Sequence, residues 1–252
     1  MPPDLARADW TITDSRAVLV TPRSRCGAVH IDLGRPEDGL EVGATRAAGD
    51  RVLGLDLGGA VRLADAWARG GDLTAVYETI DARQVRATAM WRGIGDAVGA
   101  DDDVAAWEVI VSAQTALLQS DAALAVTGDV LATTILYPAG GRASPGADRP
   151  WRASTSDGPA TARAILVRRA TATGTAASSV VVALHDEHGD AIATRIEDGH
   201  ARIACRLFRE TLEKGVLLRS RVVAAIGPAD DDTTWASRLV DRFAALPPML
   251  DT

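Results

Sequence analysis

The chain has 252 residues, of which 47% are hydrophobic and 24% are charged, so it holds enough apolar side chains for a full globular core. This length allows one large β domain or two small ones. The net charge is -7, and Lys and Arg form no dense cluster in the sequence. We therefore expect neither nucleic acid nor an anionic membrane surface as a partner, because both need clustered positive charge.

The N-terminal residues include no apolar core of a secretory signal, and no stretch approaches the ~18 apolar residues that span a bilayer. We therefore expect a soluble, cytoplasmic protein. Its two cysteines, Cys26 and Cys205, are too few for a disulfide framework. They are expected to be small buried side chains, with a single bridge as the alternative. The sequence does not indicate an oligomeric state.

Short apolar runs separated by Gly, Asp and Pro follow one another through the first 140 residues. They are about 5–8 residues long and recur every ~10–15 residues, which is typical of an all-β protein. Two stretches, 60–68 and 113–125, also fit a helix, and the glycine pairs that bracket the first favour a strand there. The expected strands cover residues 16–20, 27–33, 51–57, 61–64, 72–79, 84–91, 106–113, 124–127 and 130–137.

Residues 138–161 are rich in Pro, Gly, Ser and Ala and cannot bury a core of their own. We expect a long loop here, inside a single β-sandwich domain that covers residues 1–252, although a linker between two domains would have the same composition. The strand pattern then resumes, and the turn residues at 186–190 predict a hairpin. The later expected strands cover residues 162–169, 178–184, 191–196, 201–208 and 216–226.

A short helix is predicted at about 233–245. Acidic residues precede it, and an Asp or Thr side chain there can cap its free N–H groups. Trp235, Leu239 and Phe243 fall four residues apart and form one apolar stripe, and Pro247 ends the helix. The predicted fold class is therefore all-β, a large antiparallel β-sandwich with one C-terminal α-helix.

Strong catalytic motifs are absent: the sequence has no G-x-S-x-G, Walker loop, G-x-G-x-x-G, H-E-x-x-H or C-x-x-C. The densest group of ligand-type side chains, residues 185–190, is better explained as a turn, so we expect no metal and no cofactor. Glu210 and Glu213 are expected to point into solvent, and so is His200. No catalytic residue can be assigned from these patterns.

His30 is the histidine that the strand pattern places opposite an apolar face, between Val29 and Ile31. A solvent-facing or structural role is the simpler interpretation. Imidazole also exchanges protons near neutral pH and serves as a general base. A carboxylate facing His30 inside a cleft would favour an enzyme, whereas histidines confined to convex or loop surfaces would argue against one.

The candidate ligand-binding residues are two Trp-Arg pairs and an aspartate: Trp67, Arg69, Asp72, Trp91 and Arg92. Gly70-Gly71 predicts a tight turn, and pairing of 72–79 with 84–91 would bring both pairs to one end of a sheet. Aromatic faces with Arg and Asp hydrogen bonds suit a sugar-binding cleft. Alternatively, both tryptophans cap the core and both arginines face solvent.

The strand ending in Leu207-Phe208-Arg209-Glu210, and the turn Leu212-Glu213-Lys214-Gly215-Val216 after it, resemble the galactose-mutarotase-like β-sandwich superfamily in architecture and length. The resemblance implies a sugar-binding cleft on a concave sheet and a His and a Glu as acid and base, but no motif here matches either role. We expect a protein that binds a sugar or another polar small molecule. The alternatives are a sugar-active enzyme, epimerase-, mutarotase- or hydrolase-like, and a purely structural or interaction β-sandwich.

Overall fold

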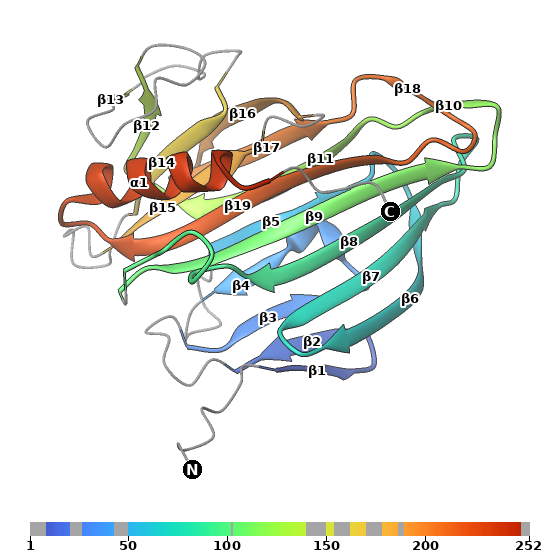
Figure 1. Ribbon diagram of the computed structural model, residues 1–252, viewed down its shortest axis with the longest axis horizontal. Helices are drawn as coiled ribbons and strands as arrows, with labels where there is room; N and C mark the ends of the chain where they lie inside the picture. The colour runs from blue at the N-terminus through green and yellow to red at the C-terminus, as the bar shows by residue number, and fades with distance from the viewer. Residues whose placement is uncertain are drawn as a thin grey trace.

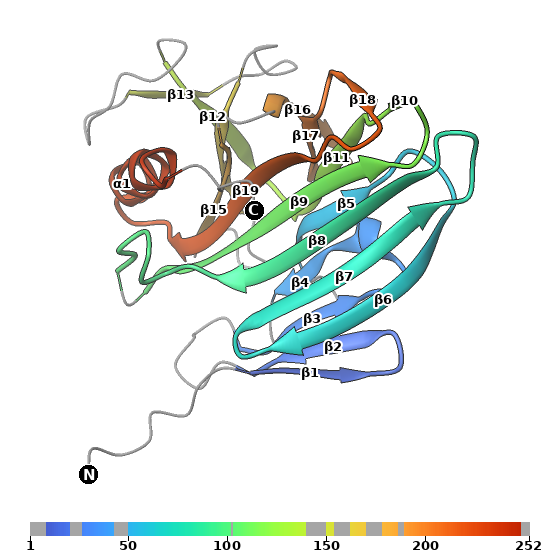
Figure 2. The same cartoon turned by 45° about the vertical axis from the view of Figure 1, so that its right-hand side comes forward.

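The computed structural model describes residues 9–20, 27–42, 50–101, 103–139, 150–153, 162–169, 178–185 and 189–247. Two large antiparallel sheets are stacked on each other, and one α-helix lies on the outer side of the second sheet (Figures 1 and 2). This confirms the predicted all-β sandwich with a C-terminal helix. Within the described residues, no helix is long and apolar enough to cross a membrane.

The first sheet, called sheet A, has eight strands in the order β1-β2-β3-β4-β5-β11-β17-β16. Strands from both ends of the sequence therefore meet in its middle, where β5 pairs with β11 and β11 with β17. The strands of sheet A are β1 (Trp10–Thr13), β2 (Arg16–Leu19), β3 (Val29–Asp32), β4 (Leu40–Val42), β5 (Asp50–Asp56), β11 (Leu124–Leu131), β16 (Gly189–Glu197) and β17 (His200–Leu207).

The second sheet, called sheet B, has nine strands in the order β13-β12-β14-β15-β19-β9-β8-β7-β6. A small two-stranded sheet of β10 (Gln119–Asp121) and β18 (Thr211–Glu213) accompanies the two layers. The strands of sheet B are β6 (Val61–Arg69), β7 (Asp72–Thr79), β8 (Val85–Gly93), β9 (Ala105–Thr115), β12 (Thr134–Pro138), β13 (Trp151–Ala153), β14 (Ala164–Arg168), β15 (Ser178–Leu184) and β19 (Leu218–Pro228).

The main hydrophobic core lies between the sheets and follows from side-chain alternation along the strands. On β17, Ile203, Cys205 and Leu207 are buried in it, whereas Arg202 and Arg206 on the other face are exposed. Cys205 is a free thiol, and burial raises its pKa to about 12, so it is an inert core side chain. Cys26 lies outside the described residues.

Local turn residues predict some hairpins correctly and one incorrectly. Strands β7 and β8 pair as predicted, and Asp198-Gly199 connects β16 to β17 with both residues at positive φ. The predicted hairpin of 178–184 with 191–196 is wrong, because β15 belongs to sheet B and β16 to sheet A. The chain crosses between the layers at this point, and a crossing uses the same turn residues as a hairpin.

The predicted loop 138–161 contains one short strand, β13, which pairs with the end of β12. Residues 140–149 and 154–161 lie outside the described part of the chain. Strands from before and after this segment occur in both sheets. Residues 60–68 form a strand as predicted, and residues 113–125 complete β9, form β10 and begin β11.

Helix α1 (Asp232–Ala244) covers the outer face of sheet B over β14, β15 and β19. Its predicted stripe of Trp235, Leu239 and Phe243 is buried there in a second apolar cluster. The expected side-chain cap is absent, since the N-cap residue Asp231 makes no such bond. Asp232 instead accepts hydrogen bonds from Arg168 at 2.8 and 2.9 Å and from Ser179 Oγ at 2.8 Å, which ties the helix to the sheet.

Replacing Asp232 by Asn should weaken this attachment by about 1–2 kcal/mol at pH 7, a modest figure because Arg168 is partly exposed and screened by solvent. Burial raises the pKa of Asp232, but the hydrogen bonds from Arg168 and Ser179 outweigh it, so the pKa lies below its usual range. The carboxylate therefore stabilises the fold above about pH 4, and this contribution is lost as the pH falls through the folded-state pKa.

Urea unfolding of both proteins at pH 7 and pH 2.5 measures this effect. The difference in unfolding free energy between wild type and Asp232→Asn should be smaller at pH 2.5, because the lower pH approaches the folded-state pKa of Asp232. A difference that is the same at both pH values would contradict the assignment.

Candidate functional site

A row of polar side chains runs across the outer face of sheet A. Strand register places His30 opposite Glu41, Glu41 opposite Arg51, Arg51 opposite Asp129 and Asp129 opposite Arg202. Directly opposite residues on neighbouring strands have Cβ atoms ~4.5–5.5 Å apart. The row therefore brings five chemically active side chains from five strands, β3, β4, β5, β11 and β17, into one line.

The outward direction of His30 and Glu41 follows from the residues beside them. Val29 and Ile31 on β3 are buried in the core, and so are Leu40 and Val42 on β4. Successive side chains of a strand point to opposite faces, so the residue between two buried ones points out. Both side chains therefore leave the same face of the sheet.

A turn over β5 forms one wall of the site. The short 3-10 helix η1 (Pro36–Asp38) lies between β3 and β4 and crosses over Gly54. A Cβ atom at Gly54 would lie 2.3 Å from the carbonyl oxygen of Glu37, so only glycine permits this approach. Thr127 on β11 donates a hydrogen bond to the same carbonyl oxygen at 3.0 Å, which holds the turn in place.

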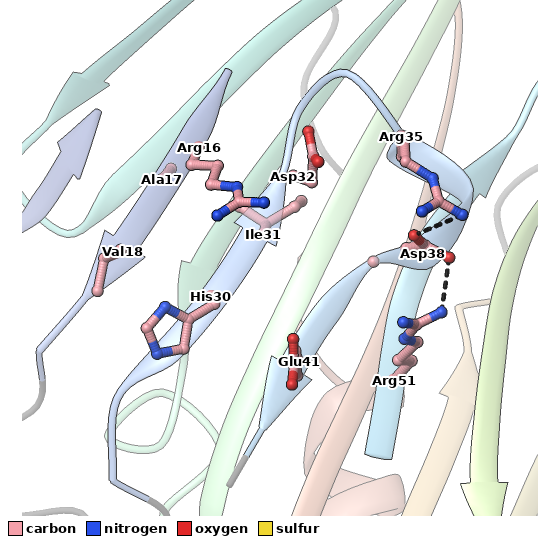
Figure 3. Close-up of a pocket in the computed structure, with 11 residues that line it drawn as sticks. Arg16, Ala17, Val18, His30, Ile31, Asp32, Arg35, Asp38, Glu41 and Arg51 are labelled. Atoms are coloured by element: carbon pink, nitrogen blue, oxygen red, sulfur yellow. Dashed lines mark hydrogen bonds and ion pairs between the residues drawn. The ribbon is translucent and has the colours of Figure 1, made fainter. Parts of the chain in front are cut away.

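The space between η1 and strands β2 to β4 is a pocket of about 300 Å³ (Figure 3). Three arginines and three acidic residues line it, so their formal charges balance. Asp38 accepts from Arg51 at 2.7 Å and forms an ion pair with Arg35 at 3.2 Å, which fixes both guanidinium groups beside the cavity (Figure 3). The lining residues are Arg16, Ala17, Val18, His30, Ile31, Asp32, Arg35, Asp38, Gly39, Glu41 and Arg51.

His30 and Glu41 are the two lining residues best placed for proton transfer. His30 is exposed and Glu41 is half-buried. Figure 3 shows the imidazole and the carboxylate projecting from neighbouring strands on the pocket side of the sheet. Neither has a hydrogen bond or ion pair with another described residue, so both are available to a ligand. An imidazole and a carboxylate can together supply the base and the acid of a proton-transfer reaction.

The second histidine on this face is already engaged. His200 Nδ1 lies 2.8 Å from Asp129 Oδ1, and Arg202 pairs with the other oxygen of Asp129. His200 is not among the residues that line the pocket. This makes it a matched control for His30 in the experiments below.

Four of the five predicted ligand-binding residues lie together, but on the outer face of sheet B. Register places Arg69 opposite Asp72, and Asp72 opposite Arg92. Trp67, opposite Thr74 in the next row, is 44% exposed. The sequence thus identified neighbouring residues on one face, while the pocket with His30 lies on the other sheet.

Trp91 does not join these four residues. It stands opposite Leu73, with its ring fully buried between the sheets and its indole N–H donating to the carbonyl oxygen of Leu53 at 2.8 Å. The prediction brought both Trp-Arg pairs to one end of the sheet, with tryptophans that cap the core as the alternative; alternation along β8 turns Trp91 inward and its neighbour Arg92 outward. Trp91 therefore packs the core and offers no face to a ligand.

The other candidates from the sequence lie apart from the pocket. His185 is buried with its ring against Phe243, and residues 186–188 lie outside the described part of the chain. Asp190 forms an ion pair with Arg209 at 2.9 Å, and Glu213 is exposed on β18. Within the described residues, no group of three or more His, Cys, Asp or Glu side chains is arranged to hold a metal ion.

The sequence analysis missed Glu41 and the arginines of the pocket. A usable signal existed, because Leu40-Glu41-Val42 repeats the apolar-polar-apolar pattern of Val29-His30-Ile31 after a short connection. Pairing these two runs as neighbouring strands places Glu41 beside His30. No comparable local pattern in the sequence predicts that Arg51 and Asp129 belong to the polar row.

The fold and the site define an antiparallel β-sandwich with a charge-balanced polar pocket on its eight-stranded sheet. No protein-family model matches the sequence, and no curated protein is similar to it. Among solved structures, it is similar to the GH36 alpha-galactosidase AgaB of Geobacillus stearothermophilus, with 8% identity, a TM-score of 0.49 and 86% of this chain covered. The chain spans only 40% of that enzyme's length.

It is also similar to the mutarotase-like protein YeaD of Salmonella typhimurium, with 9% identity and a TM-score of 0.43. That alignment covers 89% of this chain and 95% of the other. Both similarities concern architecture alone. The proposals below therefore rest on the residues of this chain.

Proposed function

We propose that the chain binds a free sugar in the pocket of sheet A and that His30 and Glu41 exchange protons with it. The balanced charges of the lining residues support an uncharged ligand rather than a polyanion. Guanidinium groups donate hydrogen bonds and carboxylates accept them, and a sugar hydroxyl does both. Among the described residues that line this pocket there is no Trp, Tyr or Phe, so hydrogen bonds rather than aromatic stacking would hold the sugar.

The pairing of His30 with Glu41 inside one pocket carries this proposal. The sequence left a binding protein and an enzyme as alternatives, and a carboxylate beside His30 in a cleft is the feature that favours the enzyme. Two groups that accept and donate protons, neither paired with a side chain in the described part of the chain, are more than recognition of a hydroxyl requires. A site with both supports acid–base chemistry on the bound sugar.

The reaction that such a pair supports is interconversion of the two anomers. One group accepts the proton of the anomeric hydroxyl, the bond between the anomeric carbon and the ring oxygen breaks, and the ring oxygen takes a proton from the other group. Ring closure from the opposite face of the carbonyl returns both protons. The reaction consumes nothing and needs no cofactor.

Polarimetry of freshly dissolved α-D-glucose and α-D-galactose tests the proposal. The wild-type chain should accelerate the change in optical rotation. His30→Gln and Glu41→Gln should each reduce that acceleration by ~100-fold or more, since general acid–base catalysis contributes ~10²–10⁴-fold. Sugar affinity should change much less than the rate.

His200→Gln is the matched control, because it removes a histidine from the same face outside the pocket. Its rate should equal that of the wild type. The proposal fails if neither sugar reacts faster with the protein present, or if His30→Gln and Glu41→Gln leave the rate unchanged. If a sugar binds but its change in optical rotation is not accelerated, the pocket is a sugar-binding site and His30 and Glu41 have no catalytic role.

A further inference from the structure

A second cavity lies on the outer face of sheet B, the face opposite to the one that contacts sheet A. It encloses about 790 Å³ and is lined by β7, β8, β9 and β19, by the segment after β8 and by the residues that follow α1. Figure 2 shows β6 to β9 side by side with no helix over them, while α1 lies farther along the sheet. The lining residues are Asp72, Arg92, Gly93, Ile94, Gly95, Asp96, Ala97, Glu108, Arg221, Leu246 and Pro247.

A buried group of three charged side chains forms the floor of this cavity. Glu108 is fully buried and Arg221 is 3% exposed. Glu108 Oε2 accepts from Arg221 Nε at 3.0 Å and Nη2 at 2.8 Å, and Glu108 Oε1 accepts from Arg92 Nε at 2.6 Å. One carboxylate therefore binds two guanidinium groups, while the whole lining, with Asp72 and Asp96, has two basic and three acidic side chains.

The two arginines differ in how many of their N–H groups already donate hydrogen bonds. Arg221 also donates to the carbonyl oxygen of Pro247 at 3.2 Å, and its guanidinium lies over the ring of Phe243, so it anchors the segment after α1. Arg92 is about one-third exposed, and its bond to Glu108 uses Nε. Within the described residues, its terminal N–H groups have no protein acceptor.

Burying charged side chains costs desolvation free energy, and apolar side chains of similar volume often stabilise the fold equally well or better. A buried carboxylate that holds a guanidinium rigidly at the edge of a cavity has a further use, because a fixed guanidinium binds a carboxylate without losing side-chain freedom. Glu108 holds Arg92 in this way. The terminal N–H groups of Arg92 can then donate hydrogen bonds to a ligand in the cavity.

Asp72 supplies the complementary group. It stands on β7 directly opposite Arg92 and is half-buried, and its carboxylate has no hydrogen bond or ion pair with another described residue. A donor and an acceptor are thus placed about one strand spacing apart at the cavity wall. Ile94 and Leu246 contribute apolar surface beside them.

We propose that this cavity is a second ligand site, separate from the sugar pocket, that binds a small carboxylic acid carrying a hydroxyl or amino group. Arg92 binds the carboxylate of the ligand, and Asp72 accepts a hydrogen bond from its hydroxyl or ammonium group. On the same face, Arg69 lies in the row of Asp72 and Arg92, and Trp67 lies in the next row.

Calorimetric titration with D-glucuronate, L-lactate and L-serine tests the site, with propane-1,2-diol as the matched ligand that lacks the carboxylate of lactate. At least one carboxylate should bind to the wild-type chain, and Arg92→Gln should weaken that binding by at least tenfold. Asp72→Asn should weaken it less. Arg86→Gln is the control, because Arg86 is on the same strand and pairs with Glu78 away from the cavity.

Each outcome of these titrations either supports or overturns the second site. Binding that survives Arg92→Gln unchanged overturns the proposal, and so does the absence of binding by all three carboxylates. His30→Gln separates the two sites, since it should leave carboxylate binding intact; loss of binding in that variant would place the ligand in sheet A and refute the second site. Equal unfolding midpoints for Arg92→Gln and Arg86→Gln exclude a folding defect as the cause.

Discussion

Replacing Trp91 by alanine is expected to lower the free energy of unfolding by about 4 kcal/mol, because large-to-small substitutions of a buried Trp typically cost ~3–5 kcal/mol. Its ring is fully buried between the two sheets, and the surrounding strands cannot collapse into the space that it leaves. The substitution also leaves the carbonyl oxygen of Leu53 without the indole N–H that now donates to it. An unsatisfied buried acceptor adds to the loss.

Trp67→Ala is the matched control, since it removes the same kind of side chain from the outer face of the same sheet, two strands away. Trp67 is 44% exposed, so we expect a loss below about 1 kcal/mol. Urea unfolding followed by far-UV circular dichroism measures both variants without relying on tryptophan fluorescence. Similar losses for the two variants would contradict the assignment of Trp91 to the core and Trp67 to the surface.

The strands of this protein were predictable because alternation is a local signal. Residues 201–208 and 72–79 form strands close to the predicted bounds, and the stripe on α1 is buried as expected. The error at residues 178–196 has a different origin. Turn residues between two apolar runs show that the chain changes direction there. They do not determine whether the second run pairs with the first or joins the other sheet.

The misplacement of Trp91 was avoidable. Once β6, β7 and β8 are paired in order, Trp67 stands opposite Thr74, and Thr74 stands opposite Met90. Trp91 follows Met90 directly, and successive side chains point to opposite faces. The two tryptophans therefore cannot share a surface in this register, and the period of two alone excludes the predicted aromatic pair.

The polar row on sheet A continues beyond the pocket, whose lining residues all lie within residues 16–51, and its far end depends on pairing between distant strands. His30 and Glu41 are near neighbours in the chain, but Arg51 meets Asp129 only because β11 is inserted beside β5. No local pattern indicates which strands become neighbours when they are separated by ~70 residues of other strands. The polar row is therefore a product of sheet order, and its residues are individually unremarkable in the sequence.

The buried charges under the second cavity give the other large expected effect. Glu108→Gln should destabilise the chain by about 3–5 kcal/mol, because it leaves Arg221 buried without its counter-charge. Arg221→Met should cost a similar amount by leaving Glu108 buried beside Arg92 alone. Combining Glu108→Gln with Arg221→Met removes both charges, and the double variant should lose much less than the sum of the two single losses.

Urea unfolding of the single and double variants at pH 7 measures this coupling, and far-UV circular dichroism confirms that each is folded. Additive losses would show that the two side chains do not act as a pair and would contradict the geometry. If the double variant is as stable as the wild type, the charges are not required for folding. Their presence at the wall of a cavity then calls for a functional reason, which is the one that the ligand titration with Arg92→Gln addresses.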